Sequence, residues 1–156
     1  MYHLHREQFL QGDLESIWKF FSSPHNLEKI TPKEMSFVVK TKLADEPIYV
    51  NLEIDYIVRP LLGIPLKWKT VITHVDPLTS FVDFQKKGPY KFWEHTHTFT
   101  ATDGGVWMTD HVKYELPFGI LGKIAHALFV KRKLQNIFNY RYRILEDKFN
   151  QKSTQL

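Results

Sequence analysis

The sequence predicts an α+β fold in which a curved, seven-stranded antiparallel sheet wraps around one long C-terminal helix, with two short helices after the first strand. In seven segments before residue 117, apolar residues alternate with polar ones, as in strands with one buried and one solvated face. From about residue 120 the apolar spacing becomes helical and stays so to residue 149. The joints between the later strands are too short for helical crossovers, which favours an antiparallel meander.

The N-terminal region is expected to contain one strand and two short helices. Residues 1–11 alternate and form the first strand candidate. Asp13 is placed as an N-cap, because its carboxylate can accept hydrogen bonds from the free amides at the start of a helix through residues 16–21. Pro24 begins a second short helix that runs to residue 30, since proline is well tolerated in the first helical turn.

Six further strand candidates follow, separated by turns rich in glycine, proline and aspartate. Alternation is clearest in the second of them, which has one apolar face and one mostly polar face. A strand of that kind has one face on the core and one in water. The candidates cover residues 36–43, 48–59, 66–76, 80–87, 90–102 and 106–116, and the apolar face of the second comprises Ile48, Val50, Leu52, Ile54, Tyr56 and Val58.

The C-terminal helix is expected from about residue 120 to residue 149. Its first apolar stripe comprises Leu121, Ile124, Ala125 and Leu128. The basic run 131–133 interrupts the stripe, so we expect the middle of the helix to be loosely packed or exposed. A helix seated across a strongly bent sheet leaves concave apolar space for a small ligand. We expect one domain over residues 1–150 and a frayed tail over residues 151–156.

The composition is that of an ordinary globular protein with many aromatic residues. Of the 156 residues, 43% are hydrophobic, 24% are charged and 15% are aromatic, which suits a thick core or a cavity wall. With no cysteine, the chain can form no disulfide, thiolate nucleophile or thiolate metal site. No signal-peptide pattern begins the chain, and no stretch nears the about 18 apolar residues of a membrane span. We therefore expect a cytoplasmic location and no stable membrane insertion.

Positive charge is concentrated in the C-terminal helix. Residues 119–148 contain seven basic and two acidic residues, a balance of +5, whereas the net charge of the whole chain is +4. We favour the interpretation that these residues form the solvated side of an amphipathic helix. The alternative is a face for nucleic acid or an anionic membrane. Because no nucleic-acid motif accompanies the charges, we expect no nucleic-acid partner.

Several short stretches, together with the order of elements, carry a resemblance to a known superfamily. They are Ile30-Thr31-Pro32, residues 81–85 with Gly88-Pro89-Tyr90, residues 93–99, residues 110–117 and Tyr140-Arg141. The chain resembles the START-like, or SRPBCC, helix-grip superfamily typified by the major birch pollen allergen, and within it bacterial ligand-binding proteins similar to the polyketide cyclase/dehydrase group. The resemblance implies a cavity between sheet and helix. It implies no particular activity, because the superfamily includes lipid carriers, cyclases, hydroxylase subunits and co-chaperones.

Residues 90–102 place two histidines on an apolar strand face. His95 and His97 alternate with polar residues and share their face with Trp93 and Phe99, so all four should point inward. A buried histidine needs a hydrogen-bond partner, and the next strand offers a carboxylate. That carboxylate is Asp110, which falls in the apolar set of Val106, Met108, Val112 and Tyr114.

The turn between these two strands allows two registers. If residues 103–104 form the loop, His97 faces Asp110. If residues 104–105 form it, Phe99 faces Asp110 and His97 becomes a diagonal neighbour. Either register keeps the apolar sets on one face and places His97 within side-chain reach of Asp110.

Three interpretations of this cluster remain open. The histidines and Asp110 form a structural hydrogen-bond network, or they bind a polar group of a mainly apolar ligand, or His97 and Asp110 act as an acid–base pair. A metal site is not expected, although His95 and His97 share a face, because neither a carboxylate shortly downstream nor a second histidine motif follows. We expect no cofactor.

The sequence thus predicts a protein that binds or carries a hydrophobic small molecule, such as a lipid, an isoprenoid or a polyketide-like compound. One alternative is a cyclase/dehydratase-type enzyme with His97 and Asp110 as candidate catalytic residues. Another is a protein-interaction module that uses the basic helix, for which no partner is specified. Asp83 and Phe81 share a strand face, and that face points inward unless the strand has the opposite orientation, with Val82 and Phe84 inward. Core packing is the simplest role for Trp68. The candidate ligand-binding residues are Trp68, Phe81, Asp83, Trp93, His95, His97, Phe99, Asp110, Val112, Tyr114, Leu121 and Leu128.

Overall fold

A computed structural model describes residues 1–41, 46–59 and 64–151. Its strands form one antiparallel sheet in the order β1-β7-β6-β5-β4-β3-β2, so the first strand of the chain pairs with the last. The strands are β1 (Tyr2–Gln11), β2 (Val38–Val39), β3 (Glu53–Val58), β4 (Leu66–Asp76), β5 (Ser80–Lys87), β6 (Phe92–Thr102) and β7 (Gly105–Glu115). The helical elements are α1 (Leu14–Phe21), α2 (Pro24–Lys29), η1 (Lys33–Met35), α3 (Gly119–Ala125), η2 (His126–Val130), α4 (Lys131–Leu145) and η3 (Glu146–Asn150).

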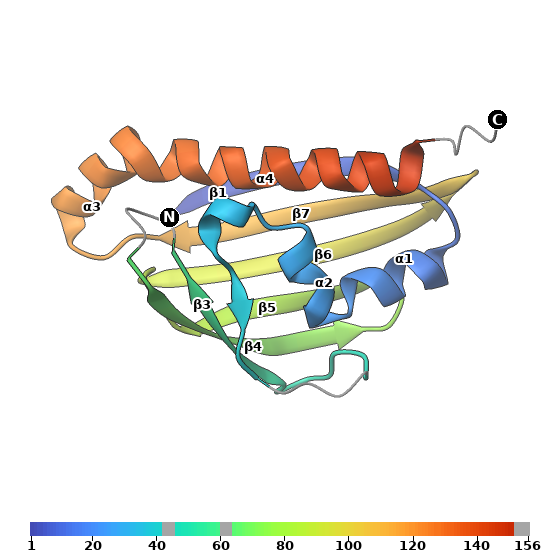
Figure 1. Ribbon diagram of the computed structural model, residues 1–156, viewed down its shortest axis with the longest axis horizontal. Coiled ribbons are helices and arrows are strands. Elements are labelled where there is room, and N and C mark those ends of the chain that lie inside the picture. The colour runs from blue at the N-terminus through green and yellow to red at the C-terminus, as the bar shows by residue number, and fades with distance from the viewer. Residues whose placement is uncertain (42–45, 60–63, 152–156) are drawn as a thin grey trace.

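The sheet curves around a helical segment that runs from Gly119 to Asn150 and comprises α3, η2, α4 and η3 (Figure 1). The short helices α1 and α2 lie toward the opposite end of the molecule from α3 (Figure 1). The predicted α+β class, the seven antiparallel strands and the long C-terminal helix are confirmed.

Local sequence signals fix the two short helices where they were expected. Asp13 caps α1, because its carboxylate accepts a hydrogen bond from the backbone N–H of Ser16 at 2.8 Å. The helix turns Trp18 into the core, where its ring meets that of Phe81 edge-on at 5.8 Å between centroids. Pro24 is the first residue of α2, where its missing N–H leaves no bond unmade.

The second of the six predicted strands is shorter than expected. β3 begins at Glu53, and the residues before it form a turn in which the Leu52 N–H donates to the Tyr49 carbonyl at 3.1 Å. Asn51 has a φ of +72°, in the left-handed region that asparagine visits more readily than most residues. This turn leaves Val50 47% exposed, so its predicted place on the apolar face is wrong.

The first of those predicted strands is reduced to the two residues of β2 within the described part of the chain. Ser36 ends η1 with a φ of +41°, and extended pairing starts only after it. The Lys40 N–H then donates to the Asp55 carbonyl at 2.8 Å, which continues the pairing with β3 by one bond. The predicted end of this strand at residues 42–43, and the predicted tail after Gln151, lie outside the described residues.

Two clusters of buried apolar side chains hold the helical segment on the sheet. The larger one packs against α1 and includes Leu145 from the last turn of α4. The smaller one joins α4 to β1, β6 and β7, with Leu134 and Phe138 packed against Trp93 and Tyr114. The middle and the end of the helical segment are therefore anchored by its own apolar residues, as an amphipathic helix requires.

The first turns of the helical segment do not bury the predicted apolar stripe. The buried residues there are Gly122 and His126, and α3 extends past the end of the sheet (Figure 1). Gly122 packs against the carbonyl of Pro117 so closely that a Cβ on it would collide with that oxygen. The stripe consequently faces outward, and its exposed members are Leu121, Ile124 and Leu128.

Candidate functional site

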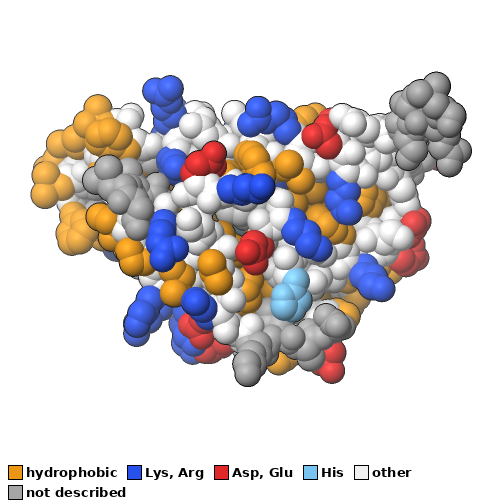
Figure 2. All heavy atoms as spheres, viewed as in Figure 1, with side chains coloured by type: hydrophobic (Ala, Val, Ile, Leu, Met, Phe, Trp, Pro, Cys, Tyr) orange, Lys and Arg blue, Asp and Glu red, His pale blue; other side chains and the backbone are white. Residues whose placement is uncertain are grey.

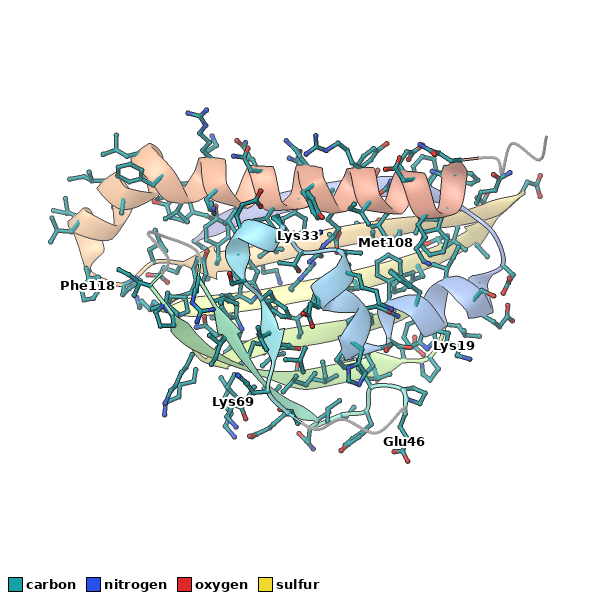
Figure 3. The ribbon with its side chains drawn as sticks, viewed as in Figure 1. Lys19, Lys33, Glu46, Lys69, Met108 and Phe118 are labelled. Carbon is teal, nitrogen blue, oxygen red and sulfur yellow. The ribbon has the colours of Figure 1, made fainter. Side chains whose placement is uncertain are left out.

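A cavity of about 550 Å³ lies between the sheet and the helical segment. Its lining side chains come from the strands of the sheet, from α2 and from α4, and α4 runs along the sheet (Figure 3). Most of the wall is aromatic or aliphatic, as in pockets that bind small organic molecules. The apolar lining includes Phe21, Ile30, Ile54, Val58, Trp68, Ile72, Phe81, Trp93, Leu134 and Phe138.

Five ionisable side chains meet at one wall of the cavity, and we call them the polar cluster. Sheet register brings four of them together, because Asp83 pairs with His95 across β5 and β6, and His97 pairs with Asp110 across β6 and β7. The turn at residues 103–104 gives the first of the two registers considered from the sequence. The five residues are Asp83, His95, His97, Asp110 and Arg141.

The two imidazoles lie between two carboxylates. Their rings are 3.8 Å apart between centroids. On one side, Nε2 of His95 donates to Oδ1 of Asp110 at 2.8 Å, and Nδ1 of His97 lies 3.0 Å from the same oxygen but off the line of a good hydrogen bond. On the other side, Nε2 of His97 donates to Oδ2 of Asp83 at 3.2 Å, and Nδ1 of His95 lies 3.5 Å from that oxygen. The prediction that Asp110 points inward and meets His97 is confirmed, since Asp110 is only 2% exposed.

Arg141 completes the polar cluster from α4. Its Nη1 lies 3.7 Å from Oδ1 of Asp110, and its guanidinium carbon lies 4.8 Å from the centre of the Phe138 ring. Among the described residues, its buried Nε and Nη1 have no hydrogen-bond acceptor. Sequence reasoning did not place Arg141 in the site. The available signal was its position at helical spacing with three buried apolar residues of α4, namely Leu134, Phe138 and Leu145.

Both carboxyl groups of the polar cluster are stabilised as anions. Burial by itself would raise the pKa of Asp110, but the hydrogen bond from His95, the close approach of His97 and the charge of Arg141 hold it well below its ordinary value. At Asp83 burial again opposes ionisation, and the charge of His95 with the hydrogen bond from His97 outweighs it and lowers the pKa.

The two histidines are shifted in opposite directions. Burial, together with the neighbouring charge of His97, lowers the pKa of His95. Burial also opposes the charged form of His97, but the close approach to the Asp110 carboxylate and the hydrogen bond to Asp83 outweigh it and raise the pKa of that side chain. The pKa of one imidazole is thus lowered and that of its close neighbour is raised.

Seven of the twelve predicted ligand-binding residues line the cavity. Asp83 has the inward orientation, on the same side of β5 as Phe81, so the alternative orientation considered from the sequence is wrong. Leu128 lines the cavity at its exposed edge. The seven are Trp68, Phe81, Asp83, Trp93, His95, His97 and Leu128.

The other five predicted residues lie elsewhere. Phe99 packs edge-on against Trp18 in the core, and Asp110 lies behind the two histidines. Val112 and Tyr114 belong to the smaller apolar cluster. Leu121, predicted to point inward, is on the surface because α3 extends past the sheet.

Three members of the polar cluster could also hold a metal ion. The donor atoms of Asp83, His95 and His97 all lie within 4.8 Å of one another, and Asp110 would accept hydrogen bonds from the outer ring nitrogens. The strand of the two histidines has no carboxylate shortly downstream of them, so its sequence did not predict a metal site. The structure supplies Asp83 from the neighbouring strand instead.

Comparisons with known proteins find likeness in structure but not in sequence. No protein-family model matches the chain, and no curated protein matches it. A protein of Thermus thermophilus is 17% identical, with a TM-score of 0.72 over 94% of this chain and 96% of that one. Major latex-like protein 151 of Panax ginseng is 13% identical, with a TM-score of 0.67 over 96% of this chain and 98% of that one. The chain has the helix-grip fold.

A third helix-grip neighbour lies within a longer protein. It is a nucleoside-diphosphate sugar epimerase of Corynebacterium glutamicum, 23% identical with a TM-score of 0.65, and the likeness covers 92% of this chain but 28% of that one. At these identities the likeness shows the helix-grip fold alone, so the function has to be argued from the cavity and the polar cluster.

Proposed function

We propose that the protein binds an apolar small molecule, such as a lipid, an isoprenoid or a polyketide-like compound, in the cavity between the sheet and α4. The observation that carries this proposal is a space of about 550 Å³ with mostly apolar walls and a few polar groups gathered at one place. Burial of apolar ligand surface supplies the affinity. The convergent polar groups then fix the orientation of the ligand, as they do in small-molecule sites generally.

The residues of the polar cluster have two different roles in this proposal. His95, His97 and Asp83 line the cavity and can reach a hydroxyl or carbonyl group of the ligand. Asp110 lies behind the histidines and holds their rings in place through Oδ1. Asp110 is therefore a positioning residue in this proposal.

A cyclase/dehydratase-type reaction in the same cavity is a second candidate function. The favouring observation is the close pair of imidazoles, whose surroundings raise the pKa of His97 and lower that of His95. A neutral imidazole can accept a proton and a protonated one can donate it, which elimination and enolisation both require. Turnover of a bound compound, lost in His97→Gln while binding persists, separates this candidate from simple binding.

We expect a naphthalene-based fluorescent dye to bind the protein saturably, with one site per chain and little change at high salt. Apolar contact in an enclosed space dominates such binding, and salt does not screen it. Val58→Phe fills part of the cavity from β3 and should lower the dye affinity by about tenfold, as over-packing removes contact volume. Fluorescence titration measures both effects.

Val82→Phe is the matched control, because Val82 lies on β5 outside the cavity lining and is partly exposed. Equal losses in the two variants would place the dye on the surface and contradict the proposal. Native mass spectrometry of freshly purified protein adds the class of any co-purifying molecule.

A further inference from the structure

The cavity wall contains buried hydrogen-bond donors for which no described residue provides an acceptor. The Arg141 side chain lines the cavity with 8% of its surface exposed, and its Nε and Nη1 have no acceptor. A buried N–H without an acceptor is unfavourable, and a guanidinium presents its donors in a fixed plane. The wall at Arg141 therefore favours a ligand atom that accepts hydrogen bonds.

The positive charge of Arg141 is already balanced by nearby carboxylates, whereas its hydrogen-bond donors lack acceptors. Asp83 and Asp110 supply two carboxylates against one guanidinium, so with neutral histidines the polar cluster has a net charge of −1. One protonated histidine brings it to zero. An anionic ligand would add a further buried negative charge beside two carboxylates, whereas a neutral acceptor adds none.

We propose that the ligand is a neutral, mainly apolar compound whose carbonyl oxygen accepts hydrogen bonds from Arg141. This assignment rests on the proposed function and narrows it from apolar molecules in general to ketones, esters and related carbonyl compounds. It also makes Arg141 the residue that distinguishes ligands with a carbonyl group from ligands without one. Hydrogen bonds to a charged donor in a low-dielectric cavity are strong enough to select between ligands of one shape.

The test uses three naphthalenes substituted at the same ring position. Acetylnaphthalene has the carbonyl, ethylnaphthalene has nearly the same shape without it, and naphthoate has a negative charge. We expect acetylnaphthalene to bind about tenfold more tightly than ethylnaphthalene. Naphthoate should bind more weakly than acetylnaphthalene, because its charge meets Asp83 and Asp110. Calorimetry or dye displacement measures the three dissociation constants.

Arg141→Met should lower the ratio of acetylnaphthalene affinity to ethylnaphthalene affinity from about tenfold to about one. Circular dichroism shows whether the variant is folded. Arg143→Met, on the exposed face of α4, is the matched control and should keep the preference. Should Arg141→Met fail to fold, the comparison of the three ligands on the unaltered protein still decides. Tighter binding of naphthoate than of acetylnaphthalene would overturn the assignment.

Three further outcomes of this test are distinguishable. If none of the three compounds binds the unaltered protein, the proposed function itself fails. If ethylnaphthalene and acetylnaphthalene bind equally well, the cavity binds apolar compounds and only the role of Arg141 is wrong. A preference that disappears with a chelator and returns with zinc would assign selection to a metal held by Asp83, His95 and His97 instead.

A separate observation concerns the surface at the α3 end of the molecule. Large apolar side chains gather there (Figure 2), and Phe118 projects at the tip (Figure 3). Their exposed fractions range from 51% to 81%, well beyond the scattered apolar residues of an ordinary surface. We call this surface the mouth patch, and it comprises Phe118, Ile120, Leu121, Ile124, Leu128 and Phe129.

The mouth patch borders both the cavity and a set of basic residues. Leu128 and Phe129 belong to the cavity lining as well as to the patch. The exposed basic residues that lie closest to the patch along the helical segment are Lys123, Lys131 and Arg132. Apolar side chains flanked by lysine and arginine are the pattern of a segment that lies in the interface of an anionic membrane.

We infer that the mouth patch docks on an anionic lipid bilayer and presents the cavity entrance to it. Charge favours this occupant over a second copy of the chain, because two copies would bring the same lysines together. None of the helices among the described residues combines the length and apolar character needed to span a bilayer. Docking is therefore peripheral and reversible, with the apolar side chains inserted at headgroup depth.

Co-flotation with vesicles tests the docking surface. The protein should bind vesicles of phosphatidylcholine with phosphatidylglycerol more tightly than vesicles of phosphatidylcholine alone, by about fivefold for each basic residue at the surface. The double variant Leu121→Glu with Ile124→Glu should lower the partition coefficient at least about tenfold, since it replaces inserted apolar groups by repelled charges.

Tyr49→Glu is the control, because Tyr49 is an exposed apolar side chain in the turn before β3 and is not part of the mouth patch. The same loss in this variant would show that any added negative charge reduces binding, and would contradict the assignment of the patch. Absence of vesicle binding by the unaltered protein would also contradict it. A concentration-dependent dimer that the double variant abolishes would make a second copy the occupant.

Discussion

Asp110→Ala is expected to lower the free energy of unfolding by about 3–5 kcal/mol, the typical loss when one partner of a buried ion pair is removed. Asp110 is 2% exposed and meets His95, His97 and Arg141 through one carboxylate oxygen. Without it, the guanidinium of Arg141 stays buried with its nearest counter-charge gone, and the imidazole of His95 loses its acceptor. Denaturant unfolding followed by circular dichroism measures the change. Asp76→Ala, at the exposed end of β4, is the control and should be nearly neutral.

A double-mutant cycle separates the free energy of the contact between His97 and Asp110 from the effect of burying each side chain. His97→Ala and Asp110→Ala, made singly and together, should show a coupling free energy of about 0.5–3 kcal/mol, because each side chain stabilises the other's charged form. Strictly additive losses would mean that the 3.0 Å approach of the two groups contributes nothing. Dye affinity measured on the same variants shows whether binding depends on the positioning of the histidines.

The sheet and half of the candidate site could be predicted from the sequence. The alternation of side chains between the two faces of a strand depends only on residues that are close together in the chain. The bounds of β4 and β5 agree with the sequence prediction at both ends. On β6 the same alternation placed His95 and His97 inward, and the short turn to β7 limited their partner to Asp110 or a diagonal neighbour. A period of two residues leaves a strand residue only two directions in which to point.

The orientation of Asp83 could not be derived in the same way. β5 has apolar residues on both faces, with Phe81 on one and Val82 on the other, so its pattern has no clear inner side. Its pairing with β4 also shifts register at two places, which no local pattern indicates. The third donor of the possible metal group depends on this orientation, because Asp83 reaches the two histidines only from the inner face of β5.

The sequence did not predict Arg141 as a site residue, because its positive charge favours a solvated position although its helical spacing favours a buried one. It occupies an inward position of α4, but an arginine in a basic helix is usually solvated, and only the carboxylates of a distant strand make its burial possible. The apolar stripe at Leu121 was predicted to be buried and is instead exposed. Its apolar spacing is helical, but whether such a stripe is buried depends on how far the sheet extends beneath it, and that length is set by the end of β7 at Glu115.

Two leucines of the helical segment should therefore respond very differently to truncation. Leu145→Ala is expected to lower the free energy of unfolding by about 3–5 kcal/mol, because Leu145 is fully buried in the larger apolar cluster and its removal leaves a cavity. Leu121→Ala should change it by no more than about 0.5 kcal/mol, since the side chain is exposed and alanine is at least as good a helix former. Denaturant unfolding of both variants gives the two values from one protocol. Equal losses at the two positions would mean that α3 packs on the protein in solution, which would remove the exposed apolar surface from which membrane docking was inferred.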